Sequence, residues 1–254
     1  MRKNRPDKGP GRFTIYGKQP VTEAIESGWP VHEVIIRRGA DQESGSSTAS
    51  KARSLGIAVS YMAERDFDAA YDKAAQGVAA VVGEVTFKEL DDVMDGIAPG
   101  SFPLFVALDG ILDPQNLGSI CRTCHSMGVH GMVVPRRRTA PFGEGAFKAS
   151  SGAIFYQPIC EVPNIHYFIQ WCQKTGIWVY GLDAGGTRCL WEVDLKGPLA
   201  LVVGSEGKGL SRLVRDRCDE IISIPMFGEI NSLNASVACG MALYEAQRQR
   251  HVEC

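Results

Sequence analysis

The strongest constraint on the fold is a regular alternation of short apolar runs and helical patterns in the later part of the chain. Runs of four or five mainly apolar residues fit buried strands, and the longer stretches between them have helical periodicity. Strands are expected at 104–108, 131–134, 177–181, 199–203 and 220–223, and helices at 117–128, 144–152, 164–175, 210–217 and 234–250. The alternation predicts an α/β fold with a mostly parallel sheet that has helices on both faces.

The earlier part of the chain predicts a second, smaller α/β unit. Strands at 31–37, 57–61 and 78–85 alternate with helical segments: the end of a short helix at 21–27, and helices at 43–55 and 65–75. Gln76-Gly77 favours a turn before the last strand. We therefore expect four segments: a flexible basic tail over 1–12, a small domain over 13–85, a linker over 86–101 and a larger domain over 102–254. A length of 254 residues is comfortable for two domains.

Composition excludes several classes of protein. The net charge of −2 excludes a uniformly basic coat, although the first twelve residues hold five Lys or Arg against one Asp. No apolar run reaches the roughly 20 residues of a membrane-spanning helix. The N-terminus leads into no apolar stretch typical of a secretory signal. The lack of a secretory pattern, together with the reduced cysteines described next, predicts a cytoplasmic protein.

The eight cysteines are spread through apolar stretches, which favours reduced, buried thiols over a disulfide framework. Cys121 and Cys124 have the spacing of a redox or zinc pair. A zinc site would want a second close pair, and the sequence has none. Packing is the favoured role for these two residues, and a redox or metal role is the alternative.

Three loops follow predicted strands, at the edge where ligands of parallel sheets bind. The first follows strand 104–108 and contains Asn116, a suitable N-cap for the next helix. Arg122 lies less than two turns further on and can project from near the same end. A capped helix with an exposed arginine has the same pattern. Because two polar side chains converge on the carboxyl end of one strand, we nevertheless favour a functional role for Asn116 and Arg122.

The second loop, Gly204-Ser-Glu-Gly-Lys-Gly209, is rich in glycine. It lacks the Gly-Lys-Ser/Thr ending of a P-loop, and its glycines have the wrong offsets for a dinucleotide fingerprint. Glu206 at its centre would repel a phosphate. The loop therefore suits a neutral or cationic ligand, or one held by backbone groups, and a plain glycine turn is the alternative.

The third loop follows strand 220–223, and Ser232 or Asn234 is expected to cap the last helix. That helix carries a stripe of apolar and small residues at helical spacing, namely Val237, Gly240, Met241 and Tyr244. Such a stripe suits either core packing or a contact between subunits.

Together, the three loops resemble the signature motifs of the SpoU (TrmH-type) branch of the SPOUT RNA methyltransferases. The matching residues are Asn116-x-Gly118-x-x-x-Arg122, Gly204-x-Glu206-x-x-Gly209-Leu210, Ile224-Pro225-Met226 and Ser232-Leu233-Asn234-x-Ser236-Val237-Ala238. Ile15-Tyr16-Gly17 and Gln76-Gly77-Val78-Ala79 are similar to the ribosomal-protein-L30e-like substrate-binding domain of the subgroup that methylates a guanosine ribose of 23S rRNA. Ala75 stands where that subgroup usually has histidine, which leaves the RNA target open but not the reaction.

The resemblance implies a SPOUT domain with a deep trefoil knot, S-adenosylmethionine bound in that knot, an obligate homodimer and no metal. The reaction it implies is methyl transfer to a ribose 2′-hydroxyl of structured RNA, with 23S rRNA the expected substrate. The family's cofactor contacts fall on Gly204, Ile224, Met226 and Leu233, largely through backbone groups. Its catalytic positions fall on Asn116, Arg122, Glu206, Ser232 and Asn234.

Arg122 matches the family residue that is proposed to remove the hydroxyl proton. Because arginine normally stays protonated, we expect Arg122 mainly to orient an RNA phosphate and the hydroxyl, with a base role as the alternative. A second basic feature, Arg136-Arg137-Arg138, directly follows strand 131–134, and Lys148 lies a few residues on. We expect these four residues to bind RNA phosphates, and the arginine run to lie on the same rim as Asn116 and Arg122. A solvated loop is the alternative.

Three other functions fit part of the pattern. A tRNA 2′-O-methyltransferase of the same branch shares all three motifs, and the additional N-terminal domain favours ribosomal RNA over it. A catalytically silent RNA-binding homologue would be expected to lack Arg122 or Asn234, and both are present. A nicotinamide-dependent oxidoreductase fits an α/β chain with glycine loops, but the glycine spacing speaks against it.

Overall fold

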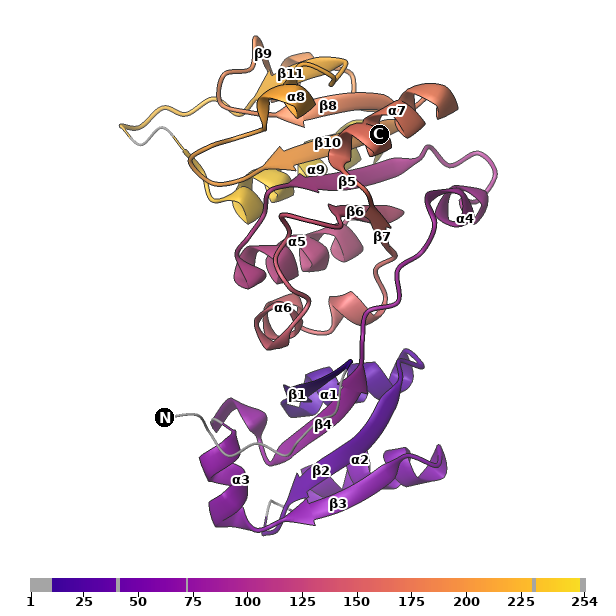
Figure 1. The fold of residues 1–254 in the computed structure, drawn as a ribbon, viewed down its shortest axis with the longest axis vertical. Helices are drawn as coiled ribbons and strands as arrows, with labels where there is room; N and C mark the ends of the chain where they lie inside the picture. The colour runs from indigo at the N-terminus through magenta and orange to yellow at the C-terminus, as the bar shows by residue number, and fades with distance from the viewer. Residues whose placement is uncertain (1–10, 40–41, 72, 230–231, 252–254) are drawn as a thin grey trace. The chain divides into compact units, whose positions relative to one another are not determined.

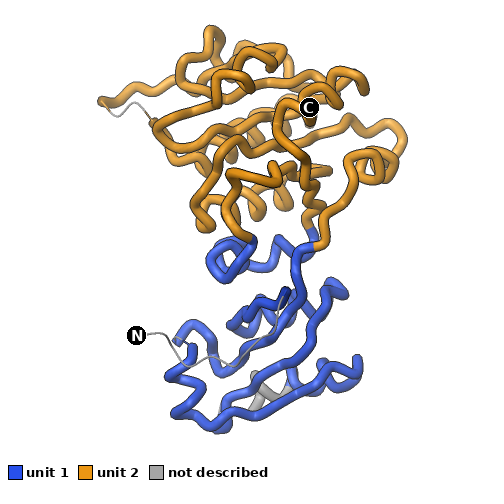
Figure 2. The backbone as a smooth tube through the Cα atoms, in the orientation of Figure 1, with its two compact units in different colours: residues 1–85, 142–156 blue, residues 86–141, 157–254 orange. Residues whose placement is uncertain are grey.

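A computed structural model of the chain describes residues 11–39, 42–71, 73–229 and 232–251, which form two compact units (Figures 1 and 2). The first unit contains the residues up to Val85 together with Phe142–Tyr156, and the second contains Thr86–Pro141 and the residues from Gln157 onward. The chain therefore leaves the second unit once and returns to it. Segment 142–156, which the sequence assigns to the larger domain, groups by its contacts with the first unit.

The first unit is a four-stranded sheet with helices, within the described residues. Its elements are β1 (Arg12–Tyr16), α1 (Lys18–Glu26), β2 (Val31–Arg37), α2 (Gln42–Ser54), β3 (Ala58–Met62), α3 (Glu64–Ala70), the 3-10 turn η1 (Lys73–Ala75), β4 (Val78–Gly83), α6 (Glu144–Ser150) and the 3-10 turn η2 (Ala153–Phe155). The strand order is β1-β4-β2-β3, and only β2 and β3 run parallel. The predicted turn before β4 is confirmed, since Gln76 and Gly77 both have positive φ.

Aromatic packing fastens α6 and η2 to the first unit. The ring of Phe147 lies 6.0 Å from that of Phe13 on β1, between ring centroids. The ring of Phe155 lies 5.3 Å from that of Trp29 and 5.5 Å from that of Phe147. These four rings hold a segment that follows β4 by about sixty residues in sequence, which explains why the contacts, and not the chain order, set the boundary of this unit.

The second unit is a seven-stranded sheet with helices, again within the described residues. Its elements are α4 (Leu90–Asp95), β5 (Leu104–Asp109), α5 (Pro114–Ser126), β6 (Gly131–Pro135), β7 (Ile159–Val162), α7 (Ile165–Thr175), β8 (Trp178–Leu182), β9 (Arg188–Cys189), the 3-10 turn η3 (Leu190–Glu192), β10 (Leu199–Gly204), α8 (Arg212–Arg215), β11 (Glu220–Ser223) and α9 (Ala235–His251). The strand order is β7-β6-β5-β10-β8-β11-β9, and the pairings are parallel. The predicted α/β class is confirmed.

Neighbouring strands β5 and β10 continue in opposite directions. The chain goes from β5 through α5 to β6 on one side of the sheet order, and from β10 through α8 to β11 on the other. Every residue of both strands is buried, because each lies between neighbours and under helices. A pair of adjacent parallel strands whose connections diverge leaves a crevice at their carboxyl ends, where ligands of such sheets bind.

Helices cover both faces of this sheet (Figure 1). On one face, α7 and α8 pack with the strands in a core that includes Phe105, Phe168 and Val214. Leu90 of α4 joins the same core, so the helix inside the predicted linker packs as part of the second unit. Helices α5 and α9 pack against each other, and α9 lies along β10. This covering explains why the strands are apolar throughout rather than alternating.

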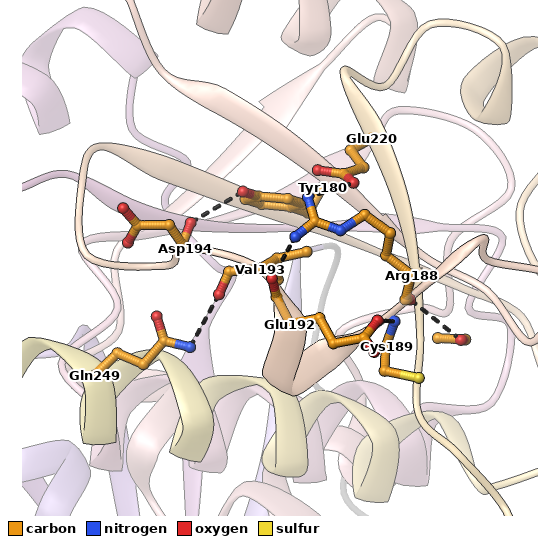
Figure 3. Close-up of polar contacts among 9 residues, drawn as sticks. Tyr180, Arg188, Cys189, Glu192, Val193, Asp194, Glu220 and Gln249 are labelled. Carbon is orange, nitrogen blue, oxygen red and sulfur yellow. Dashed lines mark hydrogen bonds and ion pairs between the residues drawn. The ribbon is translucent and has the colours of Figure 1, made fainter.

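Polar contacts hold the segment between β8 and β10 against the edge of the sheet (Figure 3). The Arg188 guanidinium pairs with Glu220 on β11 at 3.1 Å, and the Tyr180 hydroxyl donates to the Asp194 carbonyl at 2.9 Å. The side-chain amide of Gln249 on α9 donates to the Val193 carbonyl at 3.1 Å. The short strand β9 thereby protects the edge of β11, which would otherwise offer unpaired backbone groups.

The structure bears out most predicted elements and corrects some. The predicted helix 65–75 ends at Ala70, and 210–217 is reduced to Arg212–Arg215. Three strands were not predicted from the sequence, namely β1, β7 and β9. The basic tail falls almost wholly outside the described residues, and Arg12 already belongs to β1.

Five of the seven cysteines that the structure describes are buried, and the other two, Cys189 and Cys218, are half-buried. Cys121 and Cys124 are buried in α5, as the favoured packing role predicts. Burial raises the pKa of the Cys121 thiol to about 12, which keeps it protonated at neutral pH. None of the described helices combines the length and the hydropathy needed to cross a membrane.

Candidate functional site

The site lies at the carboxyl ends of β5 and β10, where loops from distant parts of the sequence meet. Glu206, in the loop after β10, is the point of contact. Its Oε1 atom accepts hydrogen bonds from the Asn116 side-chain amide at 3.2 Å and from the Ala235 backbone amide at 3.3 Å. The Asn234 side-chain amide donates to the same oxygen and, at 2.8 Å, to Asn116 Oδ1. One carboxylate thus joins all three predicted motifs.

Asn116 reaches this contact because it does not cap its helix, contrary to the prediction. Asp113 is the N-cap of α5: its carboxylate accepts from the Gln115 amide at 3.0 Å, and Pro114 takes the first helical position, which it favours. Asn116 therefore lies inside the first turn, 8% exposed, and its side chain is available to Glu206 and Asn234. Because Asn116 is not the N-cap, its side chain can connect the first motif to Glu206 of the second.

Asn234 caps the last helix, as predicted. Its Oδ1 atom accepts from the backbone amides of Ser236 at 2.9 Å and Val237 at 3.3 Å, at the start of α9. Its Nδ2 atom faces Glu206 and Asn116. A single side chain therefore satisfies the helix end and orients the carboxylate of the neighbouring loop.

A cavity of about 220 Å³ opens beside these residues. Its lining includes all four residues predicted to contact a cofactor, Gly204, Ile224, Met226 and Leu233, together with Glu206 and Ser232. Further apolar lining comes from Leu182, Val203 and Ala238, and further polar lining from Asp183 and Lys208. The mixture of apolar walls with a few converging polar groups is typical of small-molecule sites.

The glycines of the loop after β10 are required by close approach. A Cβ atom on Gly204 would lie 2.3 Å from the carbonyl carbon of Gly209, because the backbone folds back there. Ser205 and Gly209 exchange backbone hydrogen bonds at 3.2 and 2.9 Å. Gly209 also has a φ of +63°, a conformation that side chains disfavour. The loop is therefore a tight backbone turn, and its residues line the cavity.

Asp183, immediately after β8, lines the cavity and was not singled out from the sequence. Partial burial alone would raise the pKa of this carboxyl. Hydrogen bonds from the Gly185 and Leu210 amides and the charge of Arg215 outweigh burial, so the pKa lies below its ordinary range. A carboxylate directly after a predicted strand was the available signal, since Asp183 follows the apolar run that became β8.

Arg122 does not line the cavity. It is exposed on α5, eight residues after the first helical residue, at a distance of about 12 Å along the helix axis. Because α5 begins at Pro114, before the expected N-cap Asn116, Arg122 lies further from the start of the helix than the sequence predicted. The neighbouring residue Thr123 faces Gly240 of α9, so Arg122 lies near the packed pair α5 and α9.

The predicted RNA-binding residues fall in both units. Arg136, Arg137 and Arg138 follow β6 and are exposed, and Arg136 pairs with Glu161 at 3.0 Å. An Nη atom of Arg138 lies 3.9 Å from the position a Cβ atom would take on Gly110, directly after β5, so the run lies on the rim that holds the site. Lys148 belongs to the first unit, where its ammonium lies 5.5 Å from the centre of the Tyr16 ring.

The structure shows no arrangement for a metal ion among the described residues. No group of three or more His, Cys, Asp or Glu side chains there is placed to hold one. The Asn116, Glu206 and Asn234 side chains bond to one another, and Asp183 accepts from a backbone amide.

Comparisons with known proteins place two family models on the chain. The model of the SpoU rRNA methylase family matches residues 103–244. The model of the RNA 2′-O ribose methyltransferase substrate-binding family matches residues 14–87. A relative from Mycolicibacterium paratuberculosis, an uncharacterized tRNA/rRNA methyltransferase, is 41% identical over 93% of this chain and 77% of its own length. A Bacillus subtilis protein named for the TrmH family of tRNA/rRNA methyltransferases is 37% identical over 93% of this chain and 96% of its own.

Solved structures also match nearly the whole chain. The SpoU methyltransferase AviRb of Streptomyces viridochromogenes, crystallised in complex with AdoMet, gives a TM-score of 0.81 at 28% identity, over 98% of this chain and 95% of that one. An AdoMet-bound rRNA methyltransferase of Sinorhizobium meliloti gives a TM-score of 0.80 at 28% identity, over 96% and 89% of the two chains.

We expect Asn234→Ala to lower the free energy of unfolding by about 1–2 kcal/mol, because the start of α9 loses its cap and Glu206 loses a donor. Asn164→Ala is a matched control, since Asn164 caps α7 in the same way, accepting from the Tyr167 amide at 2.9 Å, away from the cavity. Urea unfolding of both variants measures the two losses. Equal stability of Asn234→Ala and the unchanged chain would contradict the assigned cap.

Proposed function

We propose a specific reaction for this chain, which belongs to the SpoU rRNA methylase family. The chain transfers a methyl group from S-adenosylmethionine to a ribose 2′-hydroxyl of structured RNA, and its substrate is a guanosine of 23S rRNA. The observation that carries the proposal is the junction of Asn116, Glu206 and Asn234 beside the cavity that Gly204 and Met226 line. We also propose a cytoplasmic location, which suits the buried, protonated thiols.

The cavity fits S-adenosylmethionine in its chemistry. Apolar side chains such as Leu233, Ile224 and Ala238 suit an adenine ring, and the tight turn at Gly204–Gly209 offers backbone groups without side chains in the way. Asp183 and Glu206 are carboxylates in the lining, which suit a cationic sulfonium and would oppose a phosphate. The match of the family model over 103–244 supports this assignment. When bound, the cofactor supplies a methyl group already activated by the sulfonium.

The residues of the chain then have to position the hydroxyl and take up its proton. The new bond joins the ribose 2′-oxygen to the methyl carbon, the sulfur–methyl bond breaks, and S-adenosylhomocysteine and the hydroxyl proton leave. Glu206 and the Asn116–Asn234 pair fix the geometry around the cavity. Orientation of two reactants in line accounts for a large share of such rate enhancements. Metal assistance is not needed because the methyl group is already activated.

Arg122 acts from the RNA side of the reaction. Its position on α5, outside the cavity lining, suits a phosphate or the ribose rather than the cofactor. Arginine stays protonated at neutral pH, so its proposed role is to hold the phosphate and orient the hydroxyl. The hydroxyl proton passes to the Glu206 carboxylate or to an RNA phosphate.

The choice of 23S rRNA rests on the first unit. The substrate-binding family model matches residues 14–87, a region beyond the methylase model, and a larger RNA offers more surface for a second domain. A tRNA substrate is the second candidate, since the relatives are named as tRNA/rRNA methyltransferases. Both targets share the same chemistry at the cavity.

We expect labelled methyl groups from S-adenosylmethionine to appear on a ribose of 23S rRNA when the chain is incubated with total rRNA and tRNA and the product is mapped. Transfer to tRNA alone would contradict the rRNA substrate, and no transfer to either would contradict the reaction.

In the same assay Arg122→Ala should lose at least about 100-fold in rate while cofactor affinity stays within about threefold, because the side chain lies outside the cavity. Equal losses of rate and cofactor binding would contradict the role of Arg122.

We expect neutralising Arg136, Arg137 and Arg138 to weaken RNA binding and to flatten its salt dependence. Each RNA phosphate that the variant no longer binds lowers the log–log slope by about 0.7–0.9. Arg136 should contribute least, because Glu161 already pairs with it. A salt titration of RNA affinity measures the effect, with cofactor affinity unchanged. The control is Arg248→Gln, near the far end of α9 and paired with Glu245. If the plots of log affinity against log salt concentration have equal slopes for the triple variant and the control, the arginine run is a solvated loop that does not bind RNA.

We propose further that the chain works as a homodimer through α9. Val237, Met241 and Tyr244 follow one another at helical spacing and are 46%, 45% and 63% exposed, an unusual amount for apolar residues on one helix face. Burial of this face against a second copy would remove it from water. We expect a dimer in sedimentation at micromolar concentrations and a shift to monomer for Met241→Glu, whereas Leu55→Glu, an exposed apolar control in the first unit, stays dimeric. A fully active monomeric wild type would contradict the proposal.

A further inference from the structure

Two carboxylates hold the end of the loop after β10 from opposite sides. Strand β10 lies between β5 and β8. Asp109 is the last residue of β5, and Asp183 directly follows β8. Asp183 Oδ2 accepts a hydrogen bond from the Leu210 amide at 3.1 Å, and Asp109 Oδ2 accepts one from the next amide along the chain, that of Ser211, at 2.7 Å. Two consecutive backbone amides of the loop after β10 are thus bound by carboxylates at the ends of β5 and β8, the two strands that flank β10.

Both carboxylates are built into the fold. Asp109 is 8% exposed, and the Asp183 side chain is 12% exposed. Asp183 Oδ1 accepts from the Gly185 amide at 2.9 Å and from Arg215 Nη1 at 2.7 Å. The pKa of Asp183 lies below its ordinary range because these donors outweigh its burial. Carboxylates this buried require such partners, and charge-assisted bonds are about twice as strong as neutral ones.

The position of Asp183 also sets the shape of the glycine turn. A Cβ atom on Gly209 would lie 2.3 Å from Asp183 Oδ2, so the carboxylate occupies the space beside the turn. The same turn closes on Gly204 at the end of β10. Removing either carboxylate frees an amide at the exit of the turn. The turn could then open without breaking any bond inside the sheet.

We propose that Asp109 and Asp183 are positioning residues that hold the turn Gly204–Gly209 in its ligand-binding shape before the cofactor arrives. This inference rests on the proposed function, since it takes the cavity to bind S-adenosylmethionine. These two carboxylates, called the clamp below, act on the chain before it binds cofactor. They restrict the conformations of the turn, so that cofactor binding has less conformational entropy to remove. Its loss therefore weakens cofactor binding and raises KM for the cofactor more than it lowers kcat at saturating cofactor.

The variants Asp183→Asn and Asp109→Asn test the clamp with almost no change in volume. Each variant loses the negative charge and keeps one acceptor oxygen. Asp183 uses both of its oxygens, so Asp183→Asn loses an acceptor as well as the charge, whereas Asp109→Asn replaces a charge-assisted bond to the Ser211 amide by a weaker neutral one. Asp219→Asn is the matched control. Asp219 also accepts a strand amide, that of Val179 at 2.8 Å, but it lies at the amino end of β8, at the opposite edge of the sheet from the cavity.

Calorimetric binding of S-adenosylmethionine and S-adenosylhomocysteine to the full chain is the first measurement. We expect Kd to rise roughly 10-fold to 100-fold for Asp183→Asn and at least about fivefold for Asp109→Asn, with Asp219→Asn within about threefold of wild type. Steady-state kinetics should show the same rise in KM, with a smaller change in kcat. Wild-type affinity in both clamp variants would overturn the proposal.

Amide hydrogen exchange of the free chain is the second measurement and needs no cofactor. Exchange in segment 204–211 should speed up about 10-fold or more in both clamp variants, while the core strand β5 keeps its protection. Wild type that binds neither compound would overturn the proposed function, and the exchange result would still decide whether the clamp exists. If both clamp variants fail to fold while Asp219→Asn folds, the clamp proposal is also overturned, because the two carboxylates would then be needed for the stability of the whole fold.

Discussion

The structure of the second unit depends on the burial of β10 between β5 and β8. Parallel ladders on both sides fix the register of β10, so the carboxyl ends of the three strands lie at one edge. The connections after β5 and β10 then diverge, and their loops face each other across the space this leaves. Each polar residue of the candidate site comes from a loop or helix start at this edge. A shift of β10 by one residue would turn its buried side chains over and separate these loops.

Amides and carboxylates, not charges of one sign, organise the site. Glu206 has hydrogen-bond donors from α5 and from the start of α9, and Asp183 has donors from two loops and from Arg215. These bonds keep both carboxylates oriented without a counter-ion from outside the chain. A cavity lined in this way favours a cationic or neutral ligand, and the glycine turn forms part of its wall. The geometry therefore agrees with the chemistry that the SpoU family performs.

Local patterns predicted most of the elements, and competition between local signals explains the errors. Asn116 is a good N-cap residue, but Asp113 followed by Pro114 is a better start, so α5 begins earlier. Strands β7 and β9 are short, and β9 exists because Arg188 and its neighbours pair with the edge of β11. The packing of α6 with Phe13 and Trp29 depends on aromatic contacts that chain order does not reveal. The knot and the dimer implied by the resemblance stay predictions.

The sequence by itself determined the α/β class and the three loops that carry polar residues, and its resemblance to a known family placed the four expected cofactor contacts on residues that line one cavity. These features follow from apolar periodicity, from glycine offsets and from motifs, which are local properties of the chain. Only the tertiary structure decided that Asn116 meets Glu206, 90 residues away, and Asn234, 118 residues away. The same holds for the pairing of Asp109 and Asp183 with consecutive amides. Such contacts depend on strand order, and strand order is set by the packing of whole elements, which no local pattern encodes.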